Sequence, residues 1–391
     1  RWQRPLTAAS DMSLQLYYDR AQRAEDFVGQ QHDTLDLEFQ HRSQVGVRHR
    51  LVWGLGYRQV ATRVDLSPII SADSDRFRLE SWNAFAQDEI SLWDERLRLT
   101  LGLKVEDNDF SGLEYQPAVR TLWKFSEHAS VWGAVSRAVR APSIMERHSA
   151  LRAATLAPGT ASPPIPLPVV LEAGGNPRFD SEYLVAYEAG LRSRPFERLA
   201  LDVAVYYNDY DDLRTVDGDS FRIAPDGSHA IVSTAFNNNA EGDAYGAEIG
   251  ADWLVRDGWR LIGAYSYIDL RLRSANNRVN VGSGTVERNA PERQLSLRSQ
   301  HTLAEDVAVD LWLRYVDDSA SAALNQRVIE TIDAYWDLDL RLAWLPRPDV
   351  ELELVAQNLL DGARFEGDME ALTTTQVEVQ RAVYAALRLR F

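Results

Sequence analysis

Hydrophobic and polar side chains alternate with a period of two along most of this chain, which is the pattern of a β-strand with two unlike faces. The clearest examples are residues 97–105, 199–208 and 336–344, where leucine, valine, tyrosine or tryptophan occupies every second position. Charged, polar or small residues stand between them, and helical periodicity is almost absent. The pattern predicts an all-β protein.

About seventeen such strands follow one another, and many are longer than the five or six residues that are usual in soluble sheets. Their connections alternate between tight turns and long segments, of which 141–180 and 213–239 are the longest. Tight turns at one end and long loops at the other are typical of an outer-membrane barrel. A soluble stack of β-sandwiches would alternate too, but its loops would not sort by end. We therefore expect a transmembrane antiparallel β-barrel with long extracellular loops at 141–180 and 213–239.

Composition excludes several other classes of protein. The net charge of -16 argues against nucleic-acid binding, because a protein that binds nucleic acid needs a basic face to neutralise phosphates. The chain has no cysteine, which removes thiol catalysis and thiolate metal sites. No run of apolar residues is long enough for a membrane-spanning helix, and no hydrolase, zinc-protease or nucleotide-binding motif occurs. We expect no enzyme activity, no cofactor and no metal site.

The last two strands carry charges that test the register of the barrel. Antiparallel pairing should place Glu351 and Glu353 opposite Arg390 and Arg388. We expect inward-facing ion pairs between the two strands, with a structural role in a water-filled lumen.

Eight segments of the chain resemble the recurrent blocks of TonB-dependent outer-membrane receptors, in the order in which that family has them. They include NAFAQDEISL, SRAVRAPS, GNPRFDSEYLVAYEAGLR and the terminal RAVYAALRLRF. The eight segments are residues 83–92, 136–143, 175–192, 240–253, 290–298, 333–344, 355–362 and 381–391.

The resemblance implies a barrel of twenty-two strands, of which this chain, residues 1–391, would supply the C-terminal seventeen or so. The plug domain and the first strands of that family have no counterpart in the chain. The resemblance also implies the partners: the TonB complex acting through the missing plug, an iron-chelate ligand, outer-membrane lipid and lipopolysaccharide, and the barrel assembly machinery. Phe391 would be the terminal aromatic residue of the assembly signal.

The function implied is energised uptake of an iron chelate, and a ferric siderophore is the first expectation. Heme or cobalamin uptake is an alternative, and a passive porin is an alternative of another class. His148 lies between blocks that flank an axial histidine in heme receptors, which makes it a candidate heme ligand. Arginine and aromatic side chains suit anionic, conjugated chelates. The candidate ligand contacts are Arg140, Arg147, His148, Arg152, Tyr210, Arg214 and Arg222.

Overall fold

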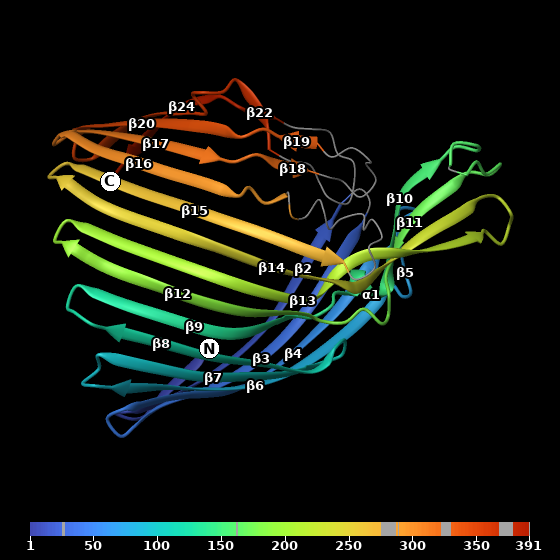
Figure 1. Ribbon diagram of the computed structural model, residues 1–391, viewed down its shortest axis with the longest axis horizontal. Helices are drawn as coiled ribbons and strands as arrows, with labels where there is room; N and C mark the ends of the chain where they lie inside the picture. Colours follow the sequence, from blue (N-terminus) through green and yellow to red (C-terminus); the bar gives the residue numbers. More distant parts are fainter. Residues whose placement is uncertain are drawn as a thin grey trace.

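The computed structural model describes residues 1–25, 28–161, 163–274, 287, 289–321, 330–366 and 378–390. Nearly all of them lie in strands (Figure 1). The long strands, which we call the wall, are β1 (Trp2–Thr7), β2 (Ser10–Ala24), β3 (Gly29–Val45), β4 (His49–Asp65), β6 (Arg76–Leu92), β7 (Leu97–Asn108), β8 (Gly112–Lys124), β9 (Ala129–Arg140), β12 (Glu182–Phe196), β13 (Leu199–Ile223), β14 (Ala230–Arg256), β15 (Trp259–Ser274), β16 (Arg293–Ala304), β17 (Val307–Val316), β20 (Tyr335–Arg347), β21 (Val350–Gln357) and β24 (Ala382–Leu389). The shorter elements are β5 (Ile70–Ala72), α1 (Ile144–His148), β10 (Ser149–Leu156), β11 (Val169–Gly174), β18 (Ser319–Ser321), β19 (Glu330–Ile332), β22 (Ala363–Phe365) and β23 (Glu378–Gln380).

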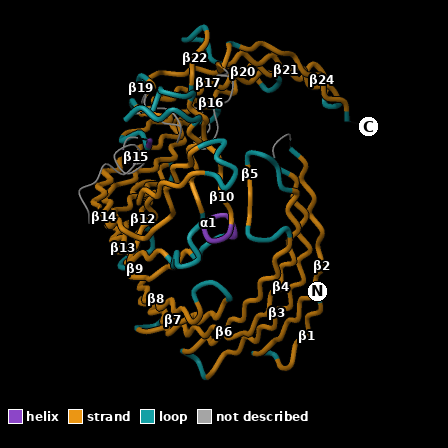
Figure 2. Tube along the Cα trace, turned by 90° about the vertical axis from the view of Figure 1, so that its right-hand side faces the viewer, coloured by secondary structure: helices purple, strands orange, loops and turns teal. Residues whose placement is uncertain are grey.

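The wall is a single antiparallel meander in which each strand pairs with the next wall strand along the chain. Its sheet has twenty strands, and removing β5, β10 and β11 leaves seventeen in the wall. The predicted antiparallel β-barrel fold with about seventeen strands is therefore confirmed. Seen end-on, the wall curves into a ring that is open between β24 and the N-terminal strands (Figure 2). Within the described residues no pairing joins β1 to β24.

Alternation builds a wall with an apolar outside rather than a buried core. On β21, Leu352 and Leu354 on the outer face are 38% and 49% exposed, whereas Glu351 on the inner face is 9% exposed. Trp336 and Trp344 at the two ends of β20 are also about half exposed on the outer face. Such a coat of large hydrophobic residues is stable against lipid and unfavourable against water. None of the helices in the described residues is long and apolar enough to cross a membrane.

The two longest connections contain regular secondary structure that the sequence pattern does not predict. Residues 213–239 form the outer halves of β13 and β14, joined by a turn at 224–229. Residues 141–180 contain α1, β10 and β11. β10 pairs with β5, and β11 pairs with β14 in the only parallel ladder among the described strands. We call β5, residues 141–180 with α1, β10 and β11, and the outer halves of β13 and β14 the apical extension.

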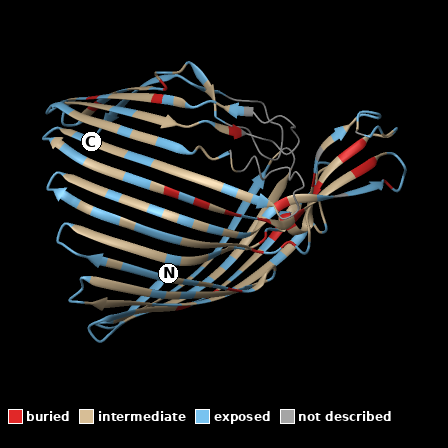
Figure 3. Ribbon diagram, viewed as in Figure 1, coloured by how far each residue is buried: buried red, intermediate tan, exposed pale blue. Residues whose placement is uncertain are grey.

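The apical extension contains most of the buried apolar residues of the described chain (Figure 3). Val169, Phe179 and Ala230 are almost inaccessible, and Leu151 and Phe236 are 3% and 6% exposed. These strands pack against other protein rather than lipid, so they need no continuous apolar face, and short polar residues such as Asp217 interrupt the alternation. This is why the sequence pattern did not reveal them.

Candidate ligand-binding site

Seen end-on, helix α1 lies within the outline of the ring (Figure 2). Its N-terminus is fixed by a capping box. The hydroxyl of Ser143 accepts the backbone N–H of Glu146 at 3.3 Å, and the carboxylate of Glu146 accepts the backbone N–H of Ser143 at 2.9 Å. Both bonds satisfy donors that would otherwise lack a partner at the helix start. Arg147 and His148 are the last residues of α1, so the capping box also fixes the position of their backbone.

Glu146 ties α1 to the wall. Its side chain is 4% exposed and accepts hydrogen bonds from Arg140 at 2.9 and 3.1 Å and from Arg214 at 3.3 Å. Glu182 on β12 also accepts from the Arg140 guanidinium, and from the backbone N–H of Arg214 at 2.6 Å. Burial alone would raise the pKa of Glu146, but hydrogen bonds from Arg140 and Ser143 outweigh it and lower the pKa below its ordinary value. Arg140 and Arg214 thus hold α1 against β9, β12 and β13.

Arg147 anchors the other end of α1. Its guanidinium donates to the carbonyl oxygens of Phe110 and Pro177 and lies 5.3 Å from the centroid of the Phe110 ring. Phe110 belongs to the turn between β7 and β8, and Pro177 precedes β12. The side chain therefore joins two distant segments.

A pocket of about 570 Å³ opens between α1 and the strands of the apical extension. Its charged lining includes Arg147, His148, Glu172, Asp217 and Arg222. Arg222 donates to Glu172 at 2.9 Å and to the hydroxyl of Ser233 at 3.1 Å. We call this the apical pocket. Its mixture of cationic and acceptor groups suits a polar ligand rather than an apolar one.

The side chain of His148 contacts Asp73 and two aromatic rings and also lines the apical pocket. Its Nδ1 lies 3.1 Å from the Asp73 carboxylate, and its ring centroid lies 5.4 Å from Phe77 and 6.0 Å from Phe110. The side chain is 29% exposed. Within the part of the chain that the structure describes, Nε2 of His148 has no hydrogen-bond partner.

The seven residues suggested by the sequence thus separate into three groups. Arg147, His148 and Arg222 line the apical pocket, and Arg140 and Arg214 belong to the Glu146 network. Arg152 donates to the carbonyl of Pro68 at 3.1 Å, and the hydroxyl of Tyr210 accepts from Asn208 at 3.4 Å. Neither of these two lines the apical pocket.

Sequence reasoning missed three acidic residues of the site, namely Asp73, Glu146 and Glu172. The S-x-x-E spacing from Ser143 to Glu146 is a helix-start signature and could have identified Glu146. No local signal marks Glu172, because its role depends on the parallel pairing of β11 with β14.

The register of the last two strands differs from the expected one. Glu351 lies opposite Arg388, and Glu353 lies opposite Ala386. Glu351 pairs with Arg388 at 2.9 Å and with Arg390 at 3.6 Å, whereas Glu353 pairs with Arg341 on β20. Placing Glu353 against Arg388 was wrong because the strands are offset by two residues. Phe391, the expected assembly signal, lies outside the described residues.

Comparison with known protein families decides the class of protein. The family model described as TonB dependent receptor-like, beta-barrel matches residues 2–359. This chain belongs to that family. It is an outer-membrane β-barrel of the receptor type.

Relatives with known names are similar over different shares of the chain. The iron-regulated outer membrane virulence protein of Vibrio cholerae serotype O1 is 26% identical over 200 residues, which are 50% of this chain and 28% of that protein. The siderophore receptor PirA of Acinetobacter baumannii has a TM-score of 0.70 at 14% identity, covering 98% of this chain and 59% of that one.

A mutant of the ferric enterobactin receptor of Pseudomonas aeruginosa, solved in complex with enterobactin, has a TM-score of 0.71 at 15% identity. The match covers 97% of this chain and 60% of that receptor. This chain therefore spans less than two thirds of the receptors that it resembles.

Proposed function

We propose that this chain forms the wall and the extracellular recognition surface of a receptor that imports a ferric siderophore with energy from TonB. The observation that carries the proposal is the apical pocket, which combines Arg147 and Arg222 with carboxylate and hydroxyl acceptors at the extracellular end of the barrel. The siderophore receptors among the similar structures support the same class of cargo.

The chemistry of the apical pocket fits an anionic iron chelate. Guanidinium groups bind anionic oxygen atoms through paired N–H donors and also stack on conjugated rings. Arg222 is 52% exposed although it pairs with Glu172, so part of its guanidinium remains open to a ligand. The plug that TonB grips would come from the rest of the receptor, and this chain would supply the fixed wall.

Binding of ferric enterobactin, measured by quenching of tryptophan fluorescence, tests the proposal. The variant Arg222→Gln should weaken binding by roughly tenfold or more, since a charge-assisted hydrogen bond contributes about 1.5–3 kcal/mol. Gly174→Leu should fill the apical pocket without strain, because a Cβ there would meet only the carbonyl of Thr234 at 3.5 Å. Arg198→Gln, at the opposite end where Arg198 pairs with Asp257 at 3.0 Å, is the matched control.

Equal affinity in all four proteins would refute the apical pocket as the site. Growth under iron limitation with defined ferric chelates would then test the imported ligand independently of the location of its binding site. A strain that expresses the complete receptor should grow on the chelate that binds, and Gly174→Leu should abolish that growth.

Heme is a second candidate cargo, and His148 is the observation that favours it. Histidines that bind a metal commonly donate their other ring nitrogen to a carboxylate, as His148 does to Asp73 in this arrangement. Titration with hemin should then give a shifted Soret band that His148→Ala removes. An unchanged spectrum in that variant would eliminate the heme role.

A further inference from the structure

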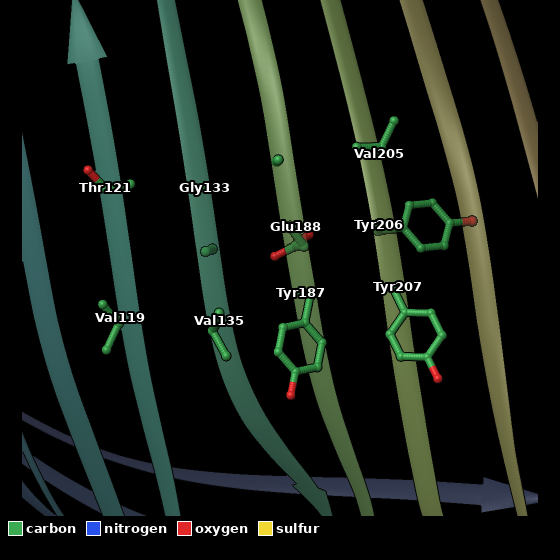
Figure 4. A pocket seen from close by; sticks show the side chains of 11 residues that line it. Val119, Thr121, Gly133, Val135, Tyr187, Glu188, Val205, Tyr206 and Tyr207 are labelled. Atoms are coloured by element: carbon green, nitrogen blue, oxygen red, sulfur yellow. The ribbon is translucent and has the colours of Figure 1, made fainter.

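The outer face of the wall contains a second hollow, which shares no lining residue with the apical pocket. It has a volume of about 530 Å³ and lies across β8, β9, β12 and β13 (Figure 4). The strand registers align Thr121, Gly133, Ala189 and Val205 in one row along its floor. We call this hollow the wall groove.

Larger residues border the wall groove on its extracellular side. The next row, aligned by the same registers, is Val119, Val135, Tyr187 and Tyr207, all between 44% and 48% exposed. Figure 4 shows the rings of Tyr187 and Tyr207 leaning away from the floor, with their hydroxyls toward the extracellular end. Tyrosines placed in this way are typical of the level where acyl chains meet head groups. The wall groove thus lies in the outer leaflet.

Arg137 lies one row further toward the outside, two residues beyond Val135 on β9 and so about 7 Å along the strand. Its guanidinium is sandwiched between the rings of Tyr115 and Tyr183, at 4.4 Å from each centroid. It also donates to the backbone carbonyl of Tyr115. The two rings hold the cation in place and leave its charge without compensation by an acid.

Other arginines of the wall are neutralised within the protein. Arg20 pairs with Asp33 at 2.5 Å, Arg271 with Asp269 at 3.0 Å, and Arg293 with Asp317 at 3.5 Å. Arg137 differs, because no carboxylate among the described residues lies within ion-pair distance of it. Glu114 accepts a hydrogen bond from the hydroxyl of Tyr183 at 3.4 Å.

We infer that the wall groove and Arg137 together bind a phosphorylated, acylated lipid of the outer leaflet, of the lipid A class. An acyl chain fills the hollow over Gly133 and Ala189, and the phosphate at the head of the lipid meets the guanidinium one row above. A half-buried cation at the head-group level needs an anion, and a phosphate matches its planar N–H donors. The inference is independent of which cargo the receptor imports.

Native mass spectrometry of the membrane-inserted protein, extracted in mild detergent and then stripped of lipid, tests this inference. Lipid A with both phosphates should rebind to the unmodified chain at one copy and at least about tenfold more tightly than to Arg137→Gln. Gly133→Leu should lose the lipid as well, because the larger side chain would occupy the wall groove. A Cβ at Gly133 would lie 3.6 Å from the carbonyl oxygen of Glu188 and 3.8 Å from Cγ2 of Thr121, so the substitution need not displace the backbone. Arg271→Gln, whose partner is Asp269, is the control and should bind as the unmodified chain does.

The lipids compared in the experiment decide the source of the phosphate. Dephosphorylated lipid A should bind at least about tenfold more weakly, and equal binding would overturn the role of Arg137. Phosphatidylglycerol binding as tightly as lipid A would overturn the assignment to the lipid A class. Equal retention of lipid A by the Arg137→Gln, Gly133→Leu and Arg271→Gln variants would overturn the site itself.

Discussion

Replacing the buried carboxylate that anchors helix α1 should loosen the apical extension and leave the wall intact. In Glu146→Gln, one of the two carboxylate oxygens becomes an NH₂ group. Oε2 accepts from the Arg140 guanidinium at 3.1 Å and from the Ser143 backbone N–H and hydroxyl at 2.9 Å each, and Oε1 accepts from Arg140 and Arg214. Either orientation of the amide therefore sets a donor against a donor.

The size of the effect follows from these contacts. A hydrogen bond to a charged group contributes about 1.5–3 kcal/mol, and at least two are lost. Arg140 and Arg214 are 46% and 40% exposed, so water compensates part of the loss. A net local destabilisation of about 2–3 kcal/mol is expected, which corresponds to roughly 30- to 150-fold more frequent opening.

Hydrogen exchange followed by mass spectrometry measures this opening segment by segment. Peptides from α1 and β10 should exchange roughly 30- to 150-fold faster in Glu146→Gln at neutral pH, while peptides from β7 stay unchanged. Glu127→Gln, in the tight turn before β9 at the opposite end, is the control. Exchange of α1 at the unmodified rate, or equal acceleration in β7, would refute the view that Glu146 stabilises the extension locally.

Three further predictions concern pH, packing and close approach of the backbone. The pKa of Glu146 is lowered in the folded protein, so the stability that its carboxylate contributes is complete above the ordinary pKa of 4.5 and is lost as the pH falls through the folded pKa. The hydrogen-exchange rate of α1, corrected for the intrinsic effect of pH, should therefore rise below about pH 4.5 in the unmodified chain. It should not rise in Glu146→Gln. Phe179→Ala, at a side chain 1% exposed, should destabilise the extension by about 3–5 kcal/mol, measured as faster proteolysis between β10 and β13, and an unchanged rate would contradict the packing role. Gly190→Ala should lower the yield of folded barrel, measured as the heat-modifiable band on gels, because a Cβ at this position would lie 2.5 Å from the ring of Trp132. Gly133→Ala is the control and should fold normally. Equal yields of the two variants would show that Trp132 moves aside.

Much of the wall could be predicted from the sequence because lipid demands a strict pattern. The alternation at residues 97–105 corresponds to β7, and that at 336–344 lies within β20. Every second residue there must be apolar to face acyl chains, so a local reading of the sequence is enough. The apical extension does not face lipid, and its sequence therefore lacks the strict alternation that would predict strands at residues 213–239.

The candidate site was predictable only in part. Arg147, His148 and Arg222 line one pocket, but their acidic neighbours come from distant segments. Glu172 reaches Arg222 across 50 residues of chain, and Asp73 reaches His148 across 75. Such partners depend on how β5, β10, β11 and β14 assemble, and no spacing along the chain encodes that assembly. The offset that separates Glu353 from Arg388 shows the same limitation in the wall.

The parallel ladder between β11 and β14 has a consequence for how the apical extension could be exchanged between related barrels. Val169 to Gly174 align residue by residue with Ala230 to Ala235, so the segment before β12 and the hairpin of β13 and β14 share one hydrogen-bonded seam. Transplanting residues 141–180 alone into another barrel would leave that seam without its complement. Exchange of recognition surfaces between receptors of this kind should therefore succeed only when both segments travel together as one module.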